Sequence, residues 1–277
     1  MLKREEIRIR DPFILTDKEH GCYYMYGTTA LEDGSLLAKN SFSVYKTDDL
    51  ENFEDPVVVF DGDEIGFWAD RDFWAPEVHA YNGKYYLFGS CKAEGKCRAT
   101  QIFVADSPMG KFRPVSDAPA TPADWECLDG TFFQENGIPY MIFSHEWTQI
   151  KNGEIWAVRL QEDLSRSIGE PFLLFRASDN PGVGELKPGT GNYVTDGPFL
   201  FREGDVIKMI WSSFYNGRYL VLEAESRDLR GPWTHFGSRF DFDGGHAMLF
   251  EHLDGKRMIS LHAPNKAGLE RASFFAY

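Results

Sequence analysis

The feature that most constrains the fold of this chain is a β-hairpin signal that recurs five times. A glycine after a polar residue separates two runs of apolar and aromatic residues at Gly21, Gly83, Gly137, Gly204 and Gly255. Asn-Gly and Asp-Gly pairs between apolar runs are strong hairpin signals, because both residues tolerate positive φ. Successive glycines are 62, 54, 67 and 51 residues apart. The chain is therefore expected to repeat one antiparallel unit along its length.

Each hairpin belongs to a larger unit. A third run follows in four copies, at residues 42–46, 100–105, 154–159 and 219–224. A fourth short run closes these copies, at residues 57–60, 112–115, 171–175 and 233–236. Four strands per repeat and five repeats predict an all-β fold, a five-bladed β-propeller with four-stranded antiparallel blades around a central channel.

The ends of the chain bear on how such a ring would close. The fifth copy has only three runs, and the alternating segment 6–10 is expected to supply its missing outer strand. No linker or low-complexity stretch divides the sequence. Residues 1–277 are therefore predicted to form one domain.

Composition excludes several partners. The chain has 29 Lys and Arg against 43 Asp and Glu, a net charge of −14, which argues against binding to nucleic acid or to an anionic membrane surface. The sequence contains no run of about 18 apolar residues, so no membrane-spanning helix is predicted. Residues 1–6 lack the apolar segment of a signal peptide, so a cytoplasmic location is expected, although a secreted mature form would look the same.

The four cysteines favour no metal site. Cys22, Cys91, Cys97 and Cys127 form no CxxC pair. Free thiols are expected, and a bridge between Cys91 and Cys97 is the alternative.

Acidic residues gather where a propeller would place its active face. The inner strand of each blade starts at one end of the channel, and Asp11, Asp129 and Asp196 stand at three such starts. Aspartate is a poor strand former, although each could alternatively serve to cap a turn. Carboxyl groups placed close together have their pKa values pushed apart, so one can hold a proton while another stays ionised. Hydrolysis of a glycosidic bond needs that combination of an acid and a base.

Other residues are expected on the same face, near the starts of inner strands or the ends of second strands. The candidates for contact with substrate are Trp74, Glu77, His145, Glu146 and Trp147. Aromatic side chains offer flat apolar faces to sugar rings. Trp74, Trp147 and Glu77 could instead serve packing or backbone hydrogen bonding.

Five motifs resemble those of glycoside hydrolase family 43, and they occur in family order, one per blade, over residues 7–277. They are Arg10-Asp11-Pro12-Phe13-Ile14, Trp74-Ala75-Pro76-Glu77, Leu128-Asp129-Gly130, Asp196-Gly197-Pro198 and Gly244-Gly245-His246. The resemblance implies a five-bladed propeller and an inverting glycosidase that acts on arabinose- or xylose-containing plant oligosaccharides or polysaccharides.

The resemblance also implies roles for single residues. Asp11 matches the general base that activates water, and Asp129 matches the aspartate that orients the acid and tunes its pKa. Asp196 stands where the family usually has a glutamate as general acid, one methylene longer, and Glu146 is the alternative acid. His246 matches a channel histidine that in many members helps to hold a cation through waters, which leaves room for a structural Ca²⁺. No organic cofactor is implied.

The sequence thus favours an exo-acting α-L-arabinofuranosidase or β-xylosidase whose partner is a carbohydrate. Two alternatives stay open: a sugar-binding propeller without catalysis, suggested by Asp196, and a glycoside phosphorylase, for which Arg10 and Arg98 are the nearest phosphate ligands. Surface loops are expected to select the substrate, namely residues 28–40, 91–98, 147–153 and 178–193, and the last is expected to form one wall of the pocket.

Overall fold

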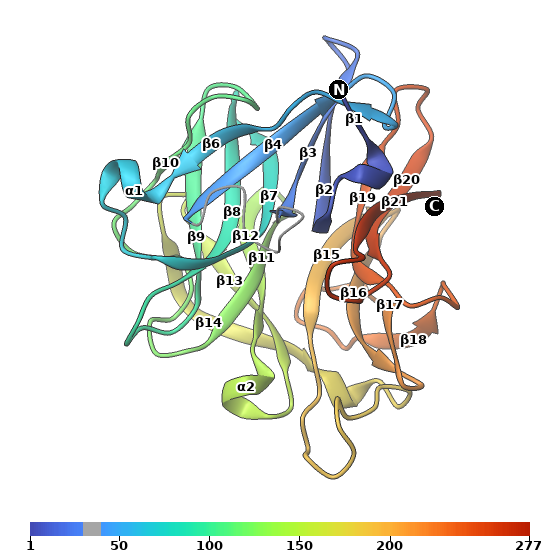
Figure 1. Ribbon diagram of the computed structural model, residues 1–277. Coiled ribbons are helices and arrows are strands. Elements are labelled where there is room, and N and C mark those ends of the chain that lie inside the picture. The colour runs from blue at the N-terminus through green and yellow to red at the C-terminus, as the bar shows by residue number, and fades with distance from the viewer. Residues whose placement is uncertain (30–39) are drawn as a thin grey trace.

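Five antiparallel sheets follow one another around a ring in the computed structural model, which describes residues 1–29 and 40–277 (Figure 1). The colour passes once around the ring from blue to red, and the strand nearest the centre is the first of its sheet in four blades and the second, Ile9–Asp17, in the blade that starts the chain. These inner strands contact one another in sequence and the last contacts the first, which closes the ring. The predicted all-β, five-bladed β-propeller is confirmed.

The blades follow the order in which the chain supplies their strands. Blade one contains β1 (Leu2–Lys3), β2 (Ile9–Asp17), β3 (Cys22–Thr29), β4 (Ser41–Thr47), β5 (Asn52–Phe53) and β6 (Val57–Asp61). Blade two contains β7 (Arg71–Tyr81), β8 (Lys84–Lys92), β9 (Ala99–Ala105) and β10 (Arg113–Pro114). Blade three contains β11 (Cys127–Glu135), β12 (Ile138–His145), β13 (Glu154–Leu160) and β14 (Ser167–Arg176). Blade four contains β15 (Asp196–Glu203), β16 (Val206–Tyr215), β17 (Arg218–Ser226) and β18 (Thr234–Ser238). Blade five contains β19 (Gly245–Glu251), β20 (Arg257–Ala263) and β21 (Arg271–Ala276).

Helical structure in the described residues is confined to short turns between strands. These are the 3-10 turns η1 (Arg4–Glu6) and η2 (Ala177–Asp179) and the one-turn helices α1 (Gly62–Ile65) and α2 (Trp147–Ile150). No helix in the described part of the chain is long and apolar enough to span a membrane.

The five glycines that predicted the hairpins adopt the conformation that the prediction requires. Gly21, Gly83, Gly137, Gly204 and Gly255 all have positive φ, between 59° and 84°. A residue with a Cβ atom is strained in this region, so glycine at these turns favours a tight antiparallel reversal. The repeat read from the sequence is therefore the repeat of the inner hairpins.

The expectation that residues 6–10 form the outer strand of blade five is wrong. Ile9 and Arg10 instead begin β2, the innermost strand of blade one, where Ile9 pairs with Thr29. The alternating pattern indicated a strand correctly, but alternation does not specify the neighbour with which a strand pairs. Near this segment the Ile9 N–H donates to the carbonyl of Glu270 over 3.3 Å, which ties blade five to blade one without an added strand.

The blades pack on one another through aromatic side chains. Phe42 and Phe60 of blade one lie against Phe73 and Phe103 of blade two, and the ring centres of Phe60 and Phe103 are 4.5 Å apart. The four cysteines are free, so no bridge joins Cys91 to Cys97. The rigid contact between neighbouring blades holds the ends of the inner strands at fixed positions around the channel.

Candidate active site

Each inner strand contains a β-bulge near its start. The pairing with the second strand skips two residues in every blade, between Arg10 and Phe13, Trp74 and Glu77, Leu128 and Thr131, Asp196 and Phe199, and Gly245 and Met248. The first skipped residue has positive φ in all five, namely Asp11, Ala75, Asp129, Gly197 and His246. Bulges re-aim side chains and are frequent next to active sites.

The bulge corrects one detail of the sequence interpretation. Asp11, Asp129 and His246 occupy the same position in their strands, but Asp196 precedes the equivalent position, which Gly197 fills. Asp196 therefore approaches the channel from one residue earlier than the other two aspartates. The motif Asp-Gly-Pro had suggested an equivalence that the register does not support.

A repeated hydrogen bond fixes each bulge to the preceding blade. The bulged N–H groups of Ala75, Asp129, His246 and Asp11 donate to side chains at the ends of second strands, over 2.8 to 3.2 Å. The acceptors are Thr28, Ser90, Ser212 and His262, respectively.

The junction between blades three and four is the exception. There the Gly197 N–H donates to Oδ2 of Asp129 over 3.0 Å. Ser144, which stands at the position of the other acceptors, leaves its buried Oγ without a partner in the described residues. The backbone that follows Asp196 thus holds the Asp129 carboxyl group in place.

The bulges surround a pocket of about 400 Å³. It is lined by Arg10, Asp11, Thr28, Trp74, Leu128, Asp129, Glu146, Trp147, Asp196 and His246, which come from all five blades. The structure thus brings together seven of the residues that the sequence singled out: the three aspartates, Trp74, Glu146, Trp147 and His246. A polar, largely preformed pocket of this size suits a small polar ligand or one part of a longer one.

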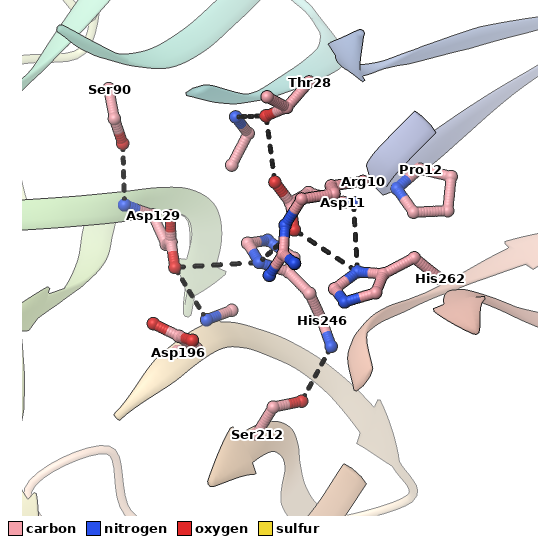
Figure 2. A network of polar contacts seen from close by, with 12 residues as sticks. Arg10, Asp11, Pro12, Thr28, Ser90, Asp129, Asp196, Ser212, His246 and His262 are labelled. Atoms are coloured by element: carbon pink, nitrogen blue, oxygen red, sulfur yellow. Dashed lines mark hydrogen bonds and ion pairs between the residues drawn. The ribbon is translucent and has the colours of Figure 1, made fainter. Parts of the chain in front are cut away.

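Asp11 is held as a carboxylate (Figure 2). Its Oδ1 lies 3.1 Å from Nδ1 of His246, and its Oδ2 accepts a hydrogen bond from the Thr28 hydroxyl over 2.9 Å. Burial alone would raise the pKa of Asp11, but the charge of His246 and a hydrogen bond from its ring outweigh it and hold this pKa well below its usual value. An ionised, oriented carboxylate is what a general base requires.

Asp129 and Asp196 have the opposite tendency. Burial, followed by the charges of Asp196 and Asp11, raises the pKa of Asp129 to about 8, although His246 opposes the shift. Burial also raises the pKa of Asp196, against the effects of His246 and of a hydrogen bond from Tyr219. The charge of Asp196 is one of the causes that raise the pKa of Asp129, so the two carboxyls titrate as a pair, which near neutral pH retains a proton that Asp11 lacks.

His246 supplies the positive charge of the site. Burial would lower its pKa, but Asp11 and Asp129 raise it to about 10, and its Nδ1 lies 3.7 Å from Oδ2 of Asp129. The ring is therefore an imidazolium at neutral pH. The described residues hold no group of three or more His, Cys, Asp or Glu side chains arranged as metal ligands. The expectation that His246 helps to hold a Ca²⁺ concerns contact through waters, since Ca²⁺ prefers oxygen ligands, and it stays a prediction.

Glu146 and Trp74 share a partner behind the pocket. The Arg98 guanidinium donates to Oε2 of Glu146 over 2.5 Å and lies 4.2 Å from the centre of the Trp74 ring. Burial raises the pKa of Glu146, while the charge of Arg98 opposes this shift. These two lining side chains are thus connected through one cation.

Glu77 and His145 lie elsewhere than expected, because neither lines the pocket. Glu77 is buried, with Oε2 3.0 Å from Nε2 of His79. His145 is stacked on Trp125 with ring centres 4.4 Å apart, and its Nε2 lies 2.7 Å from Oε1 of Gln149. Side chains alternate along a strand, so a residue near a strand end can face a neighbouring blade as readily as the channel.

The expected specificity loops contribute unequally. No residue of the segment 178–193 lines the pocket, so the expectation that it forms a wall is wrong. Trp147, from the segment 147–153, does line it. The segment 28–40 falls mostly outside the described residues, and of its described residues 28, 29 and 40, Thr28 lines the pocket.

Two contacts of the site come from residues that have no such role in the sequence-based expectations: Tyr219 has no role in them, and Arg98 appears only as a candidate phosphate ligand. Tyr219, at the start of β17, donates its hydroxyl to Oδ2 of Asp196 over 3.0 Å. Arg98, just before β9, bonds to Glu146. A third strand begins at the same end of the blade where the second strand finishes, so the start of each third run was the signal that could have found both residues.

Comparison with known proteins places this geometry in a family. The model of the family described as "Glycosyl hydrolases family 43" matches residues 6–274, nearly the whole chain. The chain belongs to glycoside hydrolase family 43. It is therefore a glycosidase, and the resemblance read from the five motifs is confirmed.

Relatives of known structure and activity cover most of the chain. A solved structure of an endo-arabinase from Bacteroides thetaiotaomicron VPI-5482 shares 38% identity at a TM-score of 0.91, and the match covers 100% of this chain and 96% of that one. A "Xylosidase/arabinosidase" from Bacteroides ovatus is 25% identical over 76% of this chain and 70% of its own length. An extracellular endo-alpha-(1->5)-L-arabinanase from Bacillus subtilis is 22% identical over 87% of this chain and 72% of its own.

Proposed function

We propose that this family 43 glycosidase hydrolyses α-L-arabinofuranosyl linkages in arabinan by an inverting mechanism. The observation that carries the mechanism is the opposed ionisation of the pocket carboxyls: Asp11 ionised beside His246, and the Asp129 and Asp196 pair with a raised pKa. The 38% identical endo-arabinase supports the substrate class. It also favours cleavage inside the chain over the exo action expected from the sequence.

Each carboxyl group has a distinct task in this reaction. Asp11 accepts a proton from a water molecule that attacks the anomeric carbon. Asp196 donates its proton to the leaving oxygen on the opposite side of the sugar, which is the division of labour of an inverting pair. Asp129 shares one proton with Asp196: while Asp196 holds it, the negative charge of Asp129 opposes its loss, and Oδ2 of Asp129 accepts a hydrogen bond from the Gly197 N–H.

Asp196 suits the role of general acid better than Glu146. Glu146 is in direct contact with the Arg98 guanidinium at 2.5 Å, which favours its ionised form. Oδ2 of Asp196 accepts a hydrogen bond from the neutral Tyr219 hydroxyl. Oδ1 is therefore the oxygen that can carry the proton. We therefore place the proton for the leaving group on Asp196 and treat Glu146 as a sugar ligand.

The two arginines considered as phosphate ligands are already paired with carboxylates. Arg10 donates to Oε1 of Glu270 over 3.1 Å, and Arg98 is paired with Glu146 and Asp72. These contacts favour attack by water over attack by phosphate.

The substrate is tested with linear 1,5-α-L-arabinan, xylan and the 4-nitrophenyl glycosides of arabinofuranose and xylose. We expect shortened arabinan oligosaccharides from arabinan, and no products from an Asp11→Asn variant. Release of xylose only would reject arabinan as the substrate. Arabinose as the sole early product would reject internal cleavage and restore the exo interpretation.

The acid is identified by changing the leaving group. A good leaving group such as 2,4-dinitrophenolate departs without a proton, whereas a sugar does not. We expect Asp196→Asn to retain most activity on 2,4-dinitrophenyl arabinofuranoside while losing activity on arabinan. Glu146→Gln is the matched variant, and we expect it to weaken both reactions together. The reverse pattern would make Glu146 the acid.

A further inference from the structure

Arg98 makes three contacts from a buried position just before β9. Its side chain is 8% exposed, and its guanidinium donates through Nη1 to Glu146 and through Nη2 to Asp72, over 2.5 Å and 2.9 Å. The same group lies against the Trp74 ring at 4.2 Å. Arg98 itself is absent from the pocket lining, whereas Glu146 and Trp74 both belong to it.

The backbone of Arg98 is fixed as firmly as its side chain. Its N–H donates to Oε2 of Glu126 over 2.8 Å, and its carbonyl accepts from the N–H of Cys127 over 2.9 Å. Arg98 therefore connects blade two to the first strand of blade three. A side chain held at both ends in this way can act as a rigid support for its neighbours.

A sugar ring presents apolar C–H faces and hydroxyl groups, and the two side chains that Arg98 holds, Trp74 and Glu146, offer a partner to each. The Trp74 ring offers an aromatic surface. A Glu146 carboxylate paired with Arg98 can only accept hydrogen bonds, which suits a sugar hydroxyl as donor. Asp72 provides the second carboxylate that an arginine fork can engage, so the guanidinium is compensated even when Glu146 turns toward a ligand.

We propose that Arg98 is a positioning residue that fixes Glu146 and Trp74 as one sugar-binding wall and thereby sets the affinity for oligosaccharide. The proposal rests on the proposed function, because it assigns this wall to the substrate of that reaction. Arg98 acts through Glu146 and Trp74 and does not itself line the pocket. Its loss is therefore expected to weaken substrate binding more than it slows bond cleavage.

The test is a double-mutant cycle on arabinan oligosaccharides. We expect Arg98→Met to raise KM roughly tenfold to a hundredfold, with kcat within about threefold of wild type. We expect Glu146→Gln to raise KM similarly, and the double variant to lose little beyond either single variant, because the two residues act through one contact. If the rises in KM of the two single variants multiplied in the double variant, the proposal would be overturned. An unchanged KM in Arg98→Met would also overturn it.

Two further variants separate positioning from folding. Arg98→Lys keeps the charge and loses the planar fork, so we expect an intermediate KM. Arg176→Met removes a half-exposed arginine that is also paired with a carboxylate, its Nε 2.9 Å from Glu154 and away from the pocket, and we expect no change in KM. The same fall in Tm and the same rise in KM in Arg98→Met, Arg98→Lys and Arg176→Met would reduce Arg98 to a structural residue.

The failure of this proposal is distinguishable from failure of the proposed function. Calorimetric titration of arabinotriose into Asp11→Asn measures binding without turnover. We expect binding there and a Kd raised at least tenfold when Arg98→Met is added. Equal Kd values in the two proteins would contradict the role of Arg98 while leaving hydrolysis intact. Absence of both binding and turnover with arabinan fragments would contradict the proposed substrate and, with it, this wall.

Discussion

The acid at position 196 combines a shorter side chain with an earlier place in its strand. Asp196 lies one residue before the bulged position that Asp11 and Asp129 occupy. Tyr219 bonds to one of its carboxyl oxygens, so the hydroxyl fixes which oxygen is available to the substrate. The departure from the glutamate usual in the family is therefore accompanied by a specific partner for the aspartate.

Tyr219→Phe tests this partnership. The Tyr219 hydrogen bond lowers the pKa of Asp196, so its removal should raise that pKa further and move the alkaline limb of kcat to higher pH. We also expect kcat at neutral pH to fall about tenfold, because the carboxyl loses its orientation. An alkaline limb that stays in place would show that the hydroxyl does not act on the acid. The measurement is the pH profile of kcat on arabinan oligosaccharides.

The pH profile of the wild type follows from the same carboxyls. Asp11 has a lowered pKa and stays ionised in mild acid, whereas the raised pKa of the Asp129 and Asp196 pair sets the loss of activity on the alkaline side. Asp129→Asn removes the second carboxyl of the pair, whose charge opposes loss of the shared proton, so we expect the alkaline limb to move to lower pH. Glu146→Gln is the control and should leave that limb unchanged. If Asp129→Asn left the alkaline limb at the same pH, Asp129 would have no role in tuning the pKa of the acid.

At the scale of elements, the hairpins were predictable and the bulges were not. Asn82-Gly83 and Asn136-Gly137 signal reversals locally, and both pairs adopt positive φ. A bulge depends on the register between two strands and on acceptors in the preceding blade, such as Ser90 for the Asp129 N–H. The sequence placed Glu77 and His145 at the pocket for a related reason. A position near a strand end indicates the face of a blade but not the direction in which each side chain points.

The bulge in blade four makes a direct prediction. A Cβ at Gly197, which has a φ of 49°, would lie 2.7 Å from the ring of His246. We expect Gly197→Ala to displace His246, to lower kcat and to destabilise the fold by several kcal/mol. Gly204→Ala is the matched control, since Gly204 has a φ of 59° and open space around it, and it should cost only about 1 kcal/mol. Equal losses of Tm in the two variants would contradict the close approach.

At the scale of the whole molecule, the ring closes through side chains as well as strands. Glu270, in the loop before β21, is buried and pairs with Arg10 over 3.1 Å and with Arg8 over 3.6 Å. The Ser260 hydroxyl donates to the Pro12 carbonyl over 2.8 Å across the same junction. The sequence indicated that five repeats must close, but these partners are about 250 residues apart and no local pattern pairs them.

Glu270→Gln tests the junction. Burial raises the pKa of Glu270, but hydrogen bonds to its carboxylate and the Arg10 charge lower it below the ordinary value of 4.5. A lowered folded pKa contributes stability that is present above the unfolded pKa and is lost as pH falls through the folded one. We expect the variant to be less stable by about 2 kcal/mol at neutral pH.

The same variant should differ less from the wild type in acid. Urea unfolding at pH 7 and at about pH 3 measures the difference, which should shrink as Glu270 takes up a proton in the wild type. A difference of the same size at both pH values would indicate that shape, rather than charge, holds the junction.

The stereochemistry of the product tests the central claim most directly. Proton NMR during the first minutes of hydrolysis of an α-linked arabinan oligosaccharide shows which anomer of the new reducing end forms first. A base that activates water on the face opposite the acid gives inversion, so the β anomer should appear first and the α anomer only later by mutarotation. First formation of the α anomer would mean retention, and it would contradict the assignment of Asp11 as the base and Asp196 as the acid.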